Sequence, residues 1–263
     1  MPLVFASITP HPPLLIPSIG KESLKKVSLT ASSMETLEEH FYASHPDSVI
    51  VISPHGSYFA DAFTINCCTE FLANMKNFGD LSVNMNFSGD FYLAQQLRDM
   101  TKRKHVSAVM LSEPELDHGV SVPLYYLSKH TNKFKLLQLG FCNLDYKSHL
   151  DFGILIKKTI HKTNKRVAVI ASGDLSHALS SDAPAGFSKQ GPEFDEKIRQ
   201  LLMSNNLSGL LQINPAFADK AAECGLRSLL ILAGILQGTT YKYTEHSYEA
   251  PFGVGYLTAE IAL

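Results

Sequence analysis

The chain has 263 residues, of which 45% are hydrophobic and 18% are charged, and its formal net charge is -2. This composition is typical of a globular protein with a large core. It provides no basic field for nucleic acid, no apolar run long enough to span a bilayer and no signal-peptide pattern. We therefore expect a cytoplasmic protein with neither nucleic acid nor membrane as a partner, and its four cysteines, which lack CxxC spacing, are expected to be reduced.

Short apolar runs alternate with helical patterns along the chain. Runs such as "SVIVIS" are short, apolar and rich in β-branched residues, as expected of strands covered on both faces. Helices between such strands predict crossover connections, and hence an α/β fold: one domain with a central, largely parallel or mixed sheet flanked by helices. The stretch 79–88 looks polar and irregular. The expected strands are 3–8, 48–53, 63–67, 134–139, 167–172 and 254–259, and the expected helices are 23–43, 91–100, 146–160, 192–203 and 226–236.

Three histidines follow predicted strands directly. His11 lies between two prolines in "TPHPP", His55 lies in "SPHG", and His177 lies in "SGDLSH". Loops at the carboxyl ends of parallel strands line the ligand crevice of an α/β sheet. These histidines, although distant in sequence, are therefore predicted to converge on one site.

The other histidines are weighed against their ordinary roles. His118, in "LDHGVSVPL", is expected in a loop because Gly119 and Pro123 break regularity, and it is a fourth candidate for the site. A lone histidine is more often solvated or structural, so only the group of four favours a functional role. His246 is interpreted as a loop residue. The rest are interpreted as solvated: His40, His45, His105, His130, His149 and His161.

Two imidazoles at one crevice favour a divalent transition metal, and two histidines with one carboxylate form the non-haem Fe(II) arrangement. Glu223 is a candidate carboxylate because it precedes a strongly apolar helical pattern, although a carboxylate there could simply offset the helix dipole. Cys224 beside it is either a small buried residue or a thiolate ligand. The sequence leaves Glu223, Cys224 and His246 as alternatives for completing the site.

Five motifs in this order resemble the class III extradiol dioxygenase superfamily: "PHPP", "SPHG", "LDHGVSVPL", "SGDLSH" and "ECGLRSLLILAGIL". That superfamily includes the catalytic subunit of protocatechuate 4,5-dioxygenase, the DOPA dioxygenases and the Memo proteins. The C-terminal "SYEAPFGVGYLTA" is similar to a subgroup of dioxygenase-B-like domains that occur with AMMECR-type domains. The resemblance covers nearly the whole chain and implies a single class III extradiol dioxygenase domain of this B-like type over 1–263.

The resemblance implies a role for each matched residue. His11, His55 and Glu223 match the metal ligands, His177 matches an acid–base histidine, and His118 matches a histidine that contacts substrate or oxygen. The implied activity is extradiol ring cleavage of a catechol-type aromatic by O2. The implied cofactor is Fe(II), with Zn(II) as the alternative. A homo-oligomer or an AMMECR-type domain is the protein partner that the resemblance suggests.

The sequence departs from the dioxygenase pattern near the third ligand. Memo proteins use a cysteine in their metal-like site, and Cys224 adjoins Glu223. DOPA dioxygenases use a third histidine, which "AECGLRS" lacks, and Asp174 before His177 resembles the Memo version. The alternative prediction is a Memo-like metal-site protein without dioxygenase activity, either a binding module or another metal-dependent redox or hydrolytic enzyme.

Overall fold

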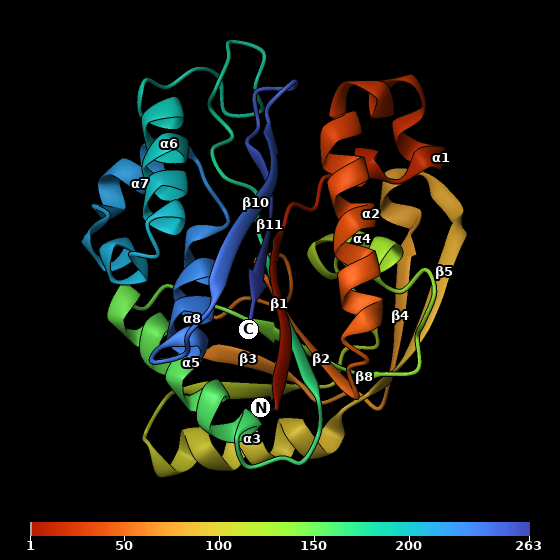
Figure 1. The fold of residues 1–263 in the computed structure, drawn as a ribbon, viewed down its shortest axis with the longest axis vertical. Helices are drawn as coiled ribbons and strands as arrows, with labels where there is room; N and C mark the ends of the chain where they lie inside the picture. Colours follow the sequence, from red (N-terminus) through yellow and green to blue (C-terminus); the bar gives the residue numbers. More distant parts are fainter. Residues whose placement is uncertain (1) are drawn as a thin grey trace.

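Four of the strands predicted to be buried form the centre of the sheet. The computed structural model describes residues 2–263, in which β1 (Leu3–Thr9), β9 (Val167–Ser172), β2 (Ser48–Ser53) and β8 (Lys135–Gly140) lie side by side in that order (Figure 1). Each adjacent pair is parallel. The carboxyl ends of these strands therefore meet at one edge of the sheet.

Antiparallel pairs occur on both sides of this centre, so the sheet is mixed. The last strand pairs with β1, and a long hairpin lies beyond β8. These outer strands are β11 (Tyr256–Ala262), β10 (Lys242–Glu249), β5 (Asp80–Gly89), β4 (Glu70–Met75), β7 (Glu115–Leu116), β3 (Phe63–Asn66) and β6 (Ala108–Leu111).

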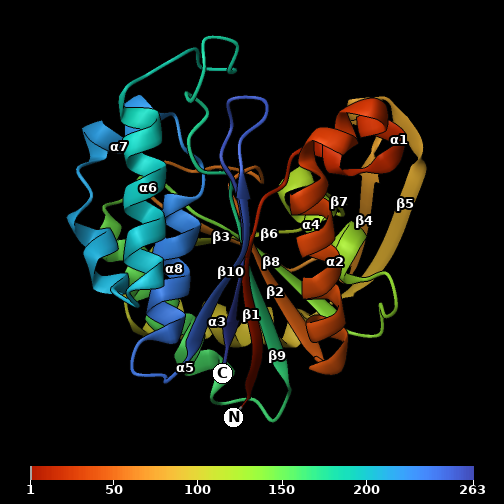
Figure 2. The ribbon, with the colours of Figure 1, turned by 45° about the horizontal axis from the view of Figure 1, so that its top comes forward.

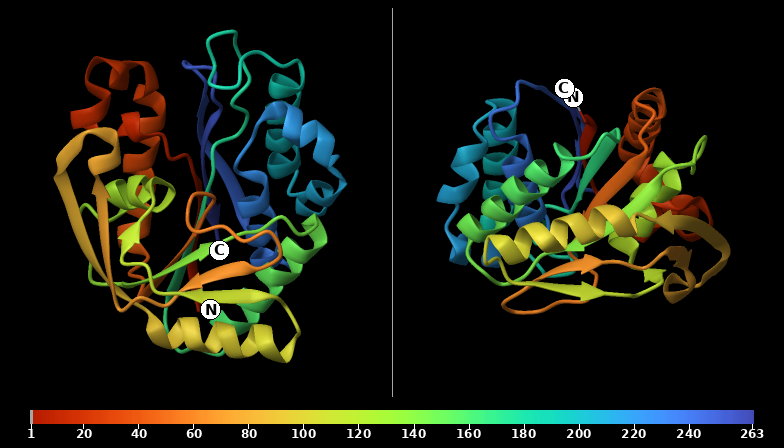
Figure 3. Two further views of the ribbon diagram at one scale, coloured as in Figure 1. Left: turned by 180° about the vertical axis from the view of Figure 1, so that it is seen from behind. Right: turned by 90° about the horizontal axis from the view of Figure 1, so that it is seen from below.

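Helices cover both faces of the sheet (Figures 1 and 2). One face carries α1 (Pro17–Gly20), α2 (Ser28–Ala43) and α4 (His118–Leu127), and the other carries α5 (Tyr146–Ile160), α6 (Gln190–Met203), α7 (Pro215–Ala221) and α8 (Leu226–Leu236). From below, α3 (Phe91–Arg103) lies alongside β3 and β6 (Figure 3). The short 3-10 helices are Pro13–Leu15, Lys21–Val27, Lys76–Phe78 and Leu207–Gln212.

The alternation of side chains along β2 explains why both faces are covered. Val49 and Val51 pack in the core beneath α2 and α4, whereas Ile50 and Ile52 pack in the core beneath α5 and α8. All four side chains are at most 1% exposed. A strand that is apolar at every position is stable only between two layers, which confirms the predicted α/β architecture.

The stretch 79–88, expected to be irregular, is mostly a strand, so that expectation was wrong. β5 pairs antiparallel with β4, and Gly79 adopts a left-handed φ of 81° at the turn between them. Val83 and Met85 are half-buried, while the intervening Asn84 is exposed. Apolar and polar residues therefore alternate with the period of two that is typical of a strand with one exposed face.

Two predicted elements begin elsewhere in the structure. The expected helix 23–43 is divided into a 3-10 segment, Lys21–Val27, followed by α2, and the expected strand 254–259 begins later, as β11. The left-handed φ of 71° at Gly253 makes a turn immediately before β11 and delays its start. Within residues 2–263, no helix combines the length and apolarity needed to cross a membrane.

Candidate metal centre

The carboxyl ends of three adjacent strands bring the predicted histidines together. β1 leads to His11, β2 leads to His55, and β9 leads to Asp174 and His177. Since β1, β9 and β2 are parallel neighbours, loops that are about 40 to 160 residues apart in sequence converge at one edge of the sheet.

His11 and His55 face each other directly. Their Nε2 atoms are 2.9 Å apart, and their rings meet edge to face at 88°. The backbone N–H of His11 donates to Asp174 Oδ1 at 3.0 Å, and its Nδ1 lies 2.9 Å from Ser172 Oγ. Ser172 and Asp174, at the end of β9, thus hold His11 in place together with the two prolines that flank it.

Both rings are held in the neutral form. Burial, followed by the nearby rings of His55, His118 and His177, lowers the pKa of His11 well below its ordinary value. Burial and then His118 lower the pKa of His55 to about 4. Neutral imidazole is the form that binds a metal through its free nitrogen, so both side chains are available as ligands near neutral pH.

The separation of the two nitrogens agrees with a shared metal ion. Two nitrogens bound at about 2.1 Å to one ion lie about 3.0 to 3.4 Å apart for bond angles between 90° and tetrahedral. The observed 2.9 Å between His11 Nε2 and His55 Nε2 is close to the lower end. When the Nδ1–H of His11 donates a hydrogen bond to Ser172 Oγ, the lone pair of His11 is on Nε2, the atom that faces His55. The residues present therefore fit a divalent transition metal.

Cys224 lies beside His11, whereas the Glu223 carboxylate contacts the start of α8. Cys224 Sγ lies 3.7 Å from His11 Nε2 and accepts the backbone N–H of Asp174 at 3.3 Å. A nitrogen and a sulfur that bind one ion tetrahedrally lie about 3.6 Å apart. Glu223 instead accepts the backbone N–H of Leu226 at 2.6 Å at the start of α8, and burial raises its pKa to about 7. The Glu223 carboxylate thus accepts a hydrogen bond at the start of α8, where the sequence left open that it simply offsets the helix dipole.

A close backbone approach brings Cys224 to the end of β9. A Cβ on Gly173 would lie 2.3 Å from the Cα of Gly225, a distance that real Cβ contacts do not reach. Only glycine at position 173 therefore lets the segment that carries Cys224 lie against the strand end. Because burial and then Asp174 raise the pKa of the Cys224 thiol well above its ordinary value, the metal-free side chain is a neutral thiol.

His118 begins α4 rather than lying in a loop, which corrects the expectation drawn from Gly119 and Pro123. Its ring stacks on His55, with centroids 4.1 Å apart and planes inclined by 24°. The ligand nitrogens of His11, His55 and His118 lie within 4.8 Å of one another. An imidazole, however, binds a metal ion that lies in the plane of its ring. The planes of two stacked rings are nearly parallel, so one ion cannot lie in both planes close to the two nitrogens. In this rotamer, His118 therefore lies beside the His11–His55 pair rather than completing it.

A buried polar network holds the start of α4 against the end of β2. Ser53 donates to Asp117 Oδ1 at 2.5 Å, and Gln138 Nε2 donates to Asp117 Oδ2 at 2.7 Å. A Cβ on Gly119 would lie 2.4 Å from Ser53 Oγ, so a glycine is needed at this contact. Sequence reasoning missed Gln138, because a glutamine inside a strand has no distinctive spacing.

His177 approaches the site through Asp174. The distance from His177 Nε2 to Asp174 Oδ2 is 3.9 Å, and the same oxygen lies 3.9 Å from His11 Nε2. The His177 side chain is 25% exposed, and burial lowers its pKa, so the ring is neutral and open to a ligand. Burial raises the pKa of Asp174 to about 7. The pair can thus hold and pass a proton beside the histidines.

Other histidines differ from their expected positions. His246 lies in strand β10 with His40 and Glu260, away from the strand-end histidines. His149, expected to be solvated, is fully buried, and its ring lies within hydrogen-bond distance of the carbonyls of Asp145 and Cys142. The ring of His149 can be buried because a backbone carbonyl accepts its N–H, and local sequence does not reveal such a partner.

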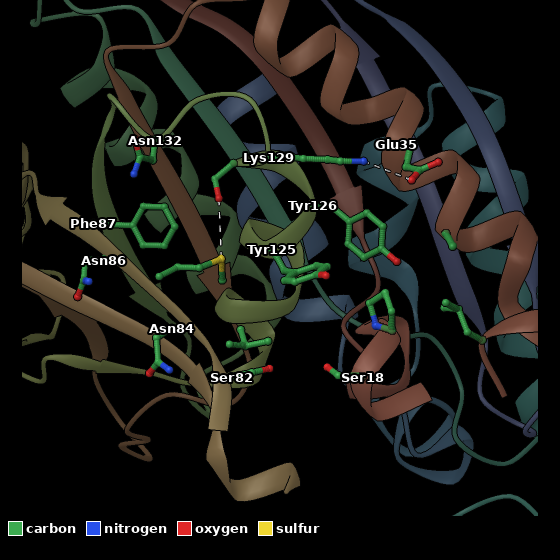
Figure 4. Close-up of a pocket in the computed structure, with 16 residues that line it drawn as sticks. Ser18, Glu35, Ser82, Asn84, Asn86, Phe87, Tyr125, Tyr126, Lys129 and Asn132 are labelled. Carbon is green, nitrogen blue, oxygen red and sulfur yellow. Dashed lines mark hydrogen bonds and ion pairs between the residues drawn. The ribbon is translucent and has the colours of Figure 1, made fainter. Parts of the chain in front are cut away.

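A large groove lies elsewhere on the molecule. It has a volume of about 980 Å³ and lies between α2, α4 and β5, where Tyr125, Tyr126, Phe87 and Asn84 line it (Figure 4). An ion pair between Lys129 and Glu35, 3.7 Å long, crosses one side. None of its lining residues is a strand-end histidine. The groove is therefore separate from the candidate metal centre.

A protein-family model matches residues 5–258, nearly the whole chain, and its description is the catalytic LigB subunit of aromatic ring-opening dioxygenase. The chain belongs to this family. The LigB family membership confirms the resemblance to class III extradiol dioxygenases, and it agrees with a metal-dependent, His-rich site at the strand ends.

Among the relatives is Protein CA_C1420 of Clostridium acetobutylicum, which is 31% identical over 95% of this chain and 55% of its own length. The chain thus spans about half of that relative. The 3,4-dihydroxyphenylacetate 2,3-dioxygenase of Escherichia coli is 27% identical over 74% of this chain and 75% of its own. The MEMO1 family protein MMP1387 of Methanococcus maripaludis is 29% identical over 40% of this chain and 37% of its own.

A solved structure shares the fold. The uncharacterized protein JW3007 of Escherichia coli K12 superposes with a TM-score of 0.68 over 98% of this chain and 100% of its own. Sequence identity is 15%, so this likeness supports the α/β architecture alone.

Proposed function

We propose that the chain is a metal-dependent extradiol dioxygenase that opens the ring of a catechol-type aromatic. The observation that carries the proposal is the pair of neutral imidazoles, His11 and His55, whose Nε2 atoms lie 2.9 Å apart at the strand ends of a LigB-family fold. Cys224 is the third ligand that we propose, because its sulfur is 3.7 Å from His11 Nε2. Glu223, which the family resemblance matches to this position, is the alternative ligand. When bound there, Fe(II) would supply the redox chemistry that couples a catechol to O2.

The other residues of the centre bind the substrate and move protons. Neutral His177 takes a proton from a catechol hydroxyl and returns it as the product forms, with Asp174 3.9 Å away to stabilise the charged ring. His118 presents a polar edge beside His55 to a substrate oxygen. The ring of Phe78 is 40% exposed and meets His118 edge to face with centroids 5.1 Å apart, so an aromatic surface borders the centre. Such a border suits an aromatic substrate.

A second function is favoured by one observation, the thiol of Cys224 at the position where the Fe(II) arrangement has a carboxylate. Thiolate ligands select Zn(II) and Cu(I) over the hard-ligand metals. A metal-site protein without ring-opening activity is therefore the alternative, and the MEMO1 family relatives agree with it. The two functions share His11 and His55 and differ in the metal and in the fate of the aromatic ring.

One experiment separates them. Protein loaded anaerobically with one equivalent of Fe(II) is mixed in air with a panel of substituted catechols, and O2 uptake and the absorbance of a conjugated ring-opened product are recorded. Extradiol cleavage predicts both signals with Fe(II) and neither with Zn(II), which has no redox chemistry. His55→Ala should lose both signals. An intact ring throughout the panel, with Fe(II) retained, would reject the dioxygenase and favour the second function.

The third ligand is tested separately with Co(II). A cobalt–thiolate bond adds an ultraviolet charge-transfer band that nitrogen and oxygen ligands do not give. We expect the band in the wild-type protein and in Cys68→Ser, a matched control at a half-buried cysteine, and its loss in Cys224→Ser. A band that survives in Cys224→Ser would exclude this thiol as a ligand.

A further inference from the structure

A second group of metal-binding side chains joins α2 to the C-terminal hairpin β10–β11. His40 comes from α2, His246 from β10 and Glu260 from β11. His40 Nδ1 is 2.7 Å and His246 Nε2 is 3.3 Å from the same carboxylate oxygen, Glu260 Oε2. The three potential ligand atoms lie within 4.8 Å of one another. We call these three residues the hairpin cluster, which shares no residue with the candidate metal centre.

An irregularity in the hairpin contributes to this geometry. The register between β10 and β11 shifts between Glu245 and Ser247, so His246 is an extra residue in the ladder. A β-bulge of this kind redirects a side chain and is frequent beside functional sites. Here the bulged residue places its imidazole beside Glu260, while α2 packs against both strands and supplies the second imidazole.

We propose that the hairpin cluster binds one divalent transition cation of the Zn²⁺ class. Two imidazoles and a carboxylate are a chemically ordinary ligand set for Zn²⁺. Both imidazoles point to a single carboxylate oxygen, so a cation among them exchanges two hydrogen bonds for three ligand bonds. The His40 side chain is 47% exposed, and those of His246 and Glu260 are 15% exposed. The cation reaches the cluster from solvent, and water completes its coordination.

The bound cation would tie together segments that are about 200 residues apart in sequence. It binds the folded arrangement of α2, β10 and β11 but has no such arrangement to bind in the unfolded chain. Binding therefore raises the stability of the folded protein by mass action. In protein whose His11 and His55 are replaced, zinc should therefore still raise the thermal midpoint, through the hairpin cluster.

The test is Zn²⁺ titration of untagged His11→Ala/His55→Ala protein, followed by calorimetry and thermal unfolding. We expect one equivalent of Zn²⁺ and a rise in the midpoint. Adding His246→Ala should weaken Zn²⁺ binding at least tenfold and abolish the rise. Adding His130→Ala is the matched control, because His130 pairs with Glu38 of α2 at 2.8 Å without a second imidazole.

Two results would overturn the proposal. One is the absence of Zn²⁺ binding in the double variant, and the other is equal binding by its His246→Ala and His130→Ala derivatives. If the double variant does not fold, the stoichiometry of otherwise unaltered protein decides: His246→Ala must lose one equivalent relative to wild type, and His130→Ala must lose none. Since no outcome depends on ring opening, failure here leaves the proposed function unaffected.

Discussion

Asp195 offers a direct test of how burial acts on the loop that carries His177. Its side chain, 1% exposed, accepts the backbone N–H of Ser176 at 2.8 Å and the hydroxyl of Tyr248 at 2.7 Å. Burial outweighs these two hydrogen bonds and raises the pKa of Asp195 from 3.8 to about 6. Asp195→Asn retains an acceptor for Ser176 and a polar partner for Tyr248 but cannot ionise.

The size and sign of the effect follow from the shift in pKa. A rise of about 2 units corresponds to about 3 kcal/mol. Because the folded-state pKa of Asp195 lies above its unfolded value, the folded state binds the proton more tightly. The stabilisation of the folded state by this proton is complete below about pH 4 and is lost as the pH rises to about 6. The free energy of unfolding of Asp195→Asn minus that of wild type should therefore increase by about 3 kcal/mol between pH 4 and pH 7.

The measurement is urea unfolding of both proteins at several pH values between 4 and 7. Other titrating groups, including Glu223, are common to both proteins and cancel in the difference. Asp99→Asn, at an exposed position on α3, is the matched control for the loss of one carboxyl group. A difference for Asp195→Asn that changes by less than about 0.5 kcal/mol would show that burial does not control this carboxyl group.

Three further predictions concern the core and the centre. Phe63→Ala removes a fully buried ring stacked 4.1 Å from Phe152, and denaturant unfolding should show a loss of about 3–5 kcal/mol. Gly173→Ala must displace the backbone at Gly225, so calorimetry should show weaker binding of Co(II) at the strand ends with the fold retained by circular dichroism. His177→Ala should keep its metal while the ring-opening rate falls roughly 10²–10⁴-fold. Loss of the metal from this variant would instead show that His177 is a ligand.

The central strands and the place of the histidines are encoded locally. Runs with consecutive apolar residues, such as the four in the middle of "SVIVIS", are stable only between two layers of helices, so their identity as central strands is a property of the sequence alone. His11 and His55 come directly after such runs, and parallel strands align their carboxyl ends. Their convergence therefore follows from the topology of the parallel strands.

Polar patterns and helix starts were harder to predict. The strand β5 was missed although Val83, Met85 and Phe87 alternate with polar residues, because the stretch as a whole is polar. The start of α4 at His118 was missed because Gly119 and Pro123 usually break helices. In the structure, Gly119 is required by the contact with Ser53, and Pro123 lies inside the helix. Long-range packing overrode local propensity at both places.

Which side chains point at one another depends on tertiary packing. Glu223 and Cys224 are adjacent in sequence, but the carboxylate caps α8 while the sulfur lies 3.7 Å from His11 Nε2. That choice depends on the approach of the chain at position 224 to the end of β9, a contact between residues about 50 apart. The cluster of His40, His246 and Glu260 likewise depends on a helix packing on a hairpin some 200 residues away. The direction of a side chain at a turn is set by such distant contacts, and the local sequence does not encode them.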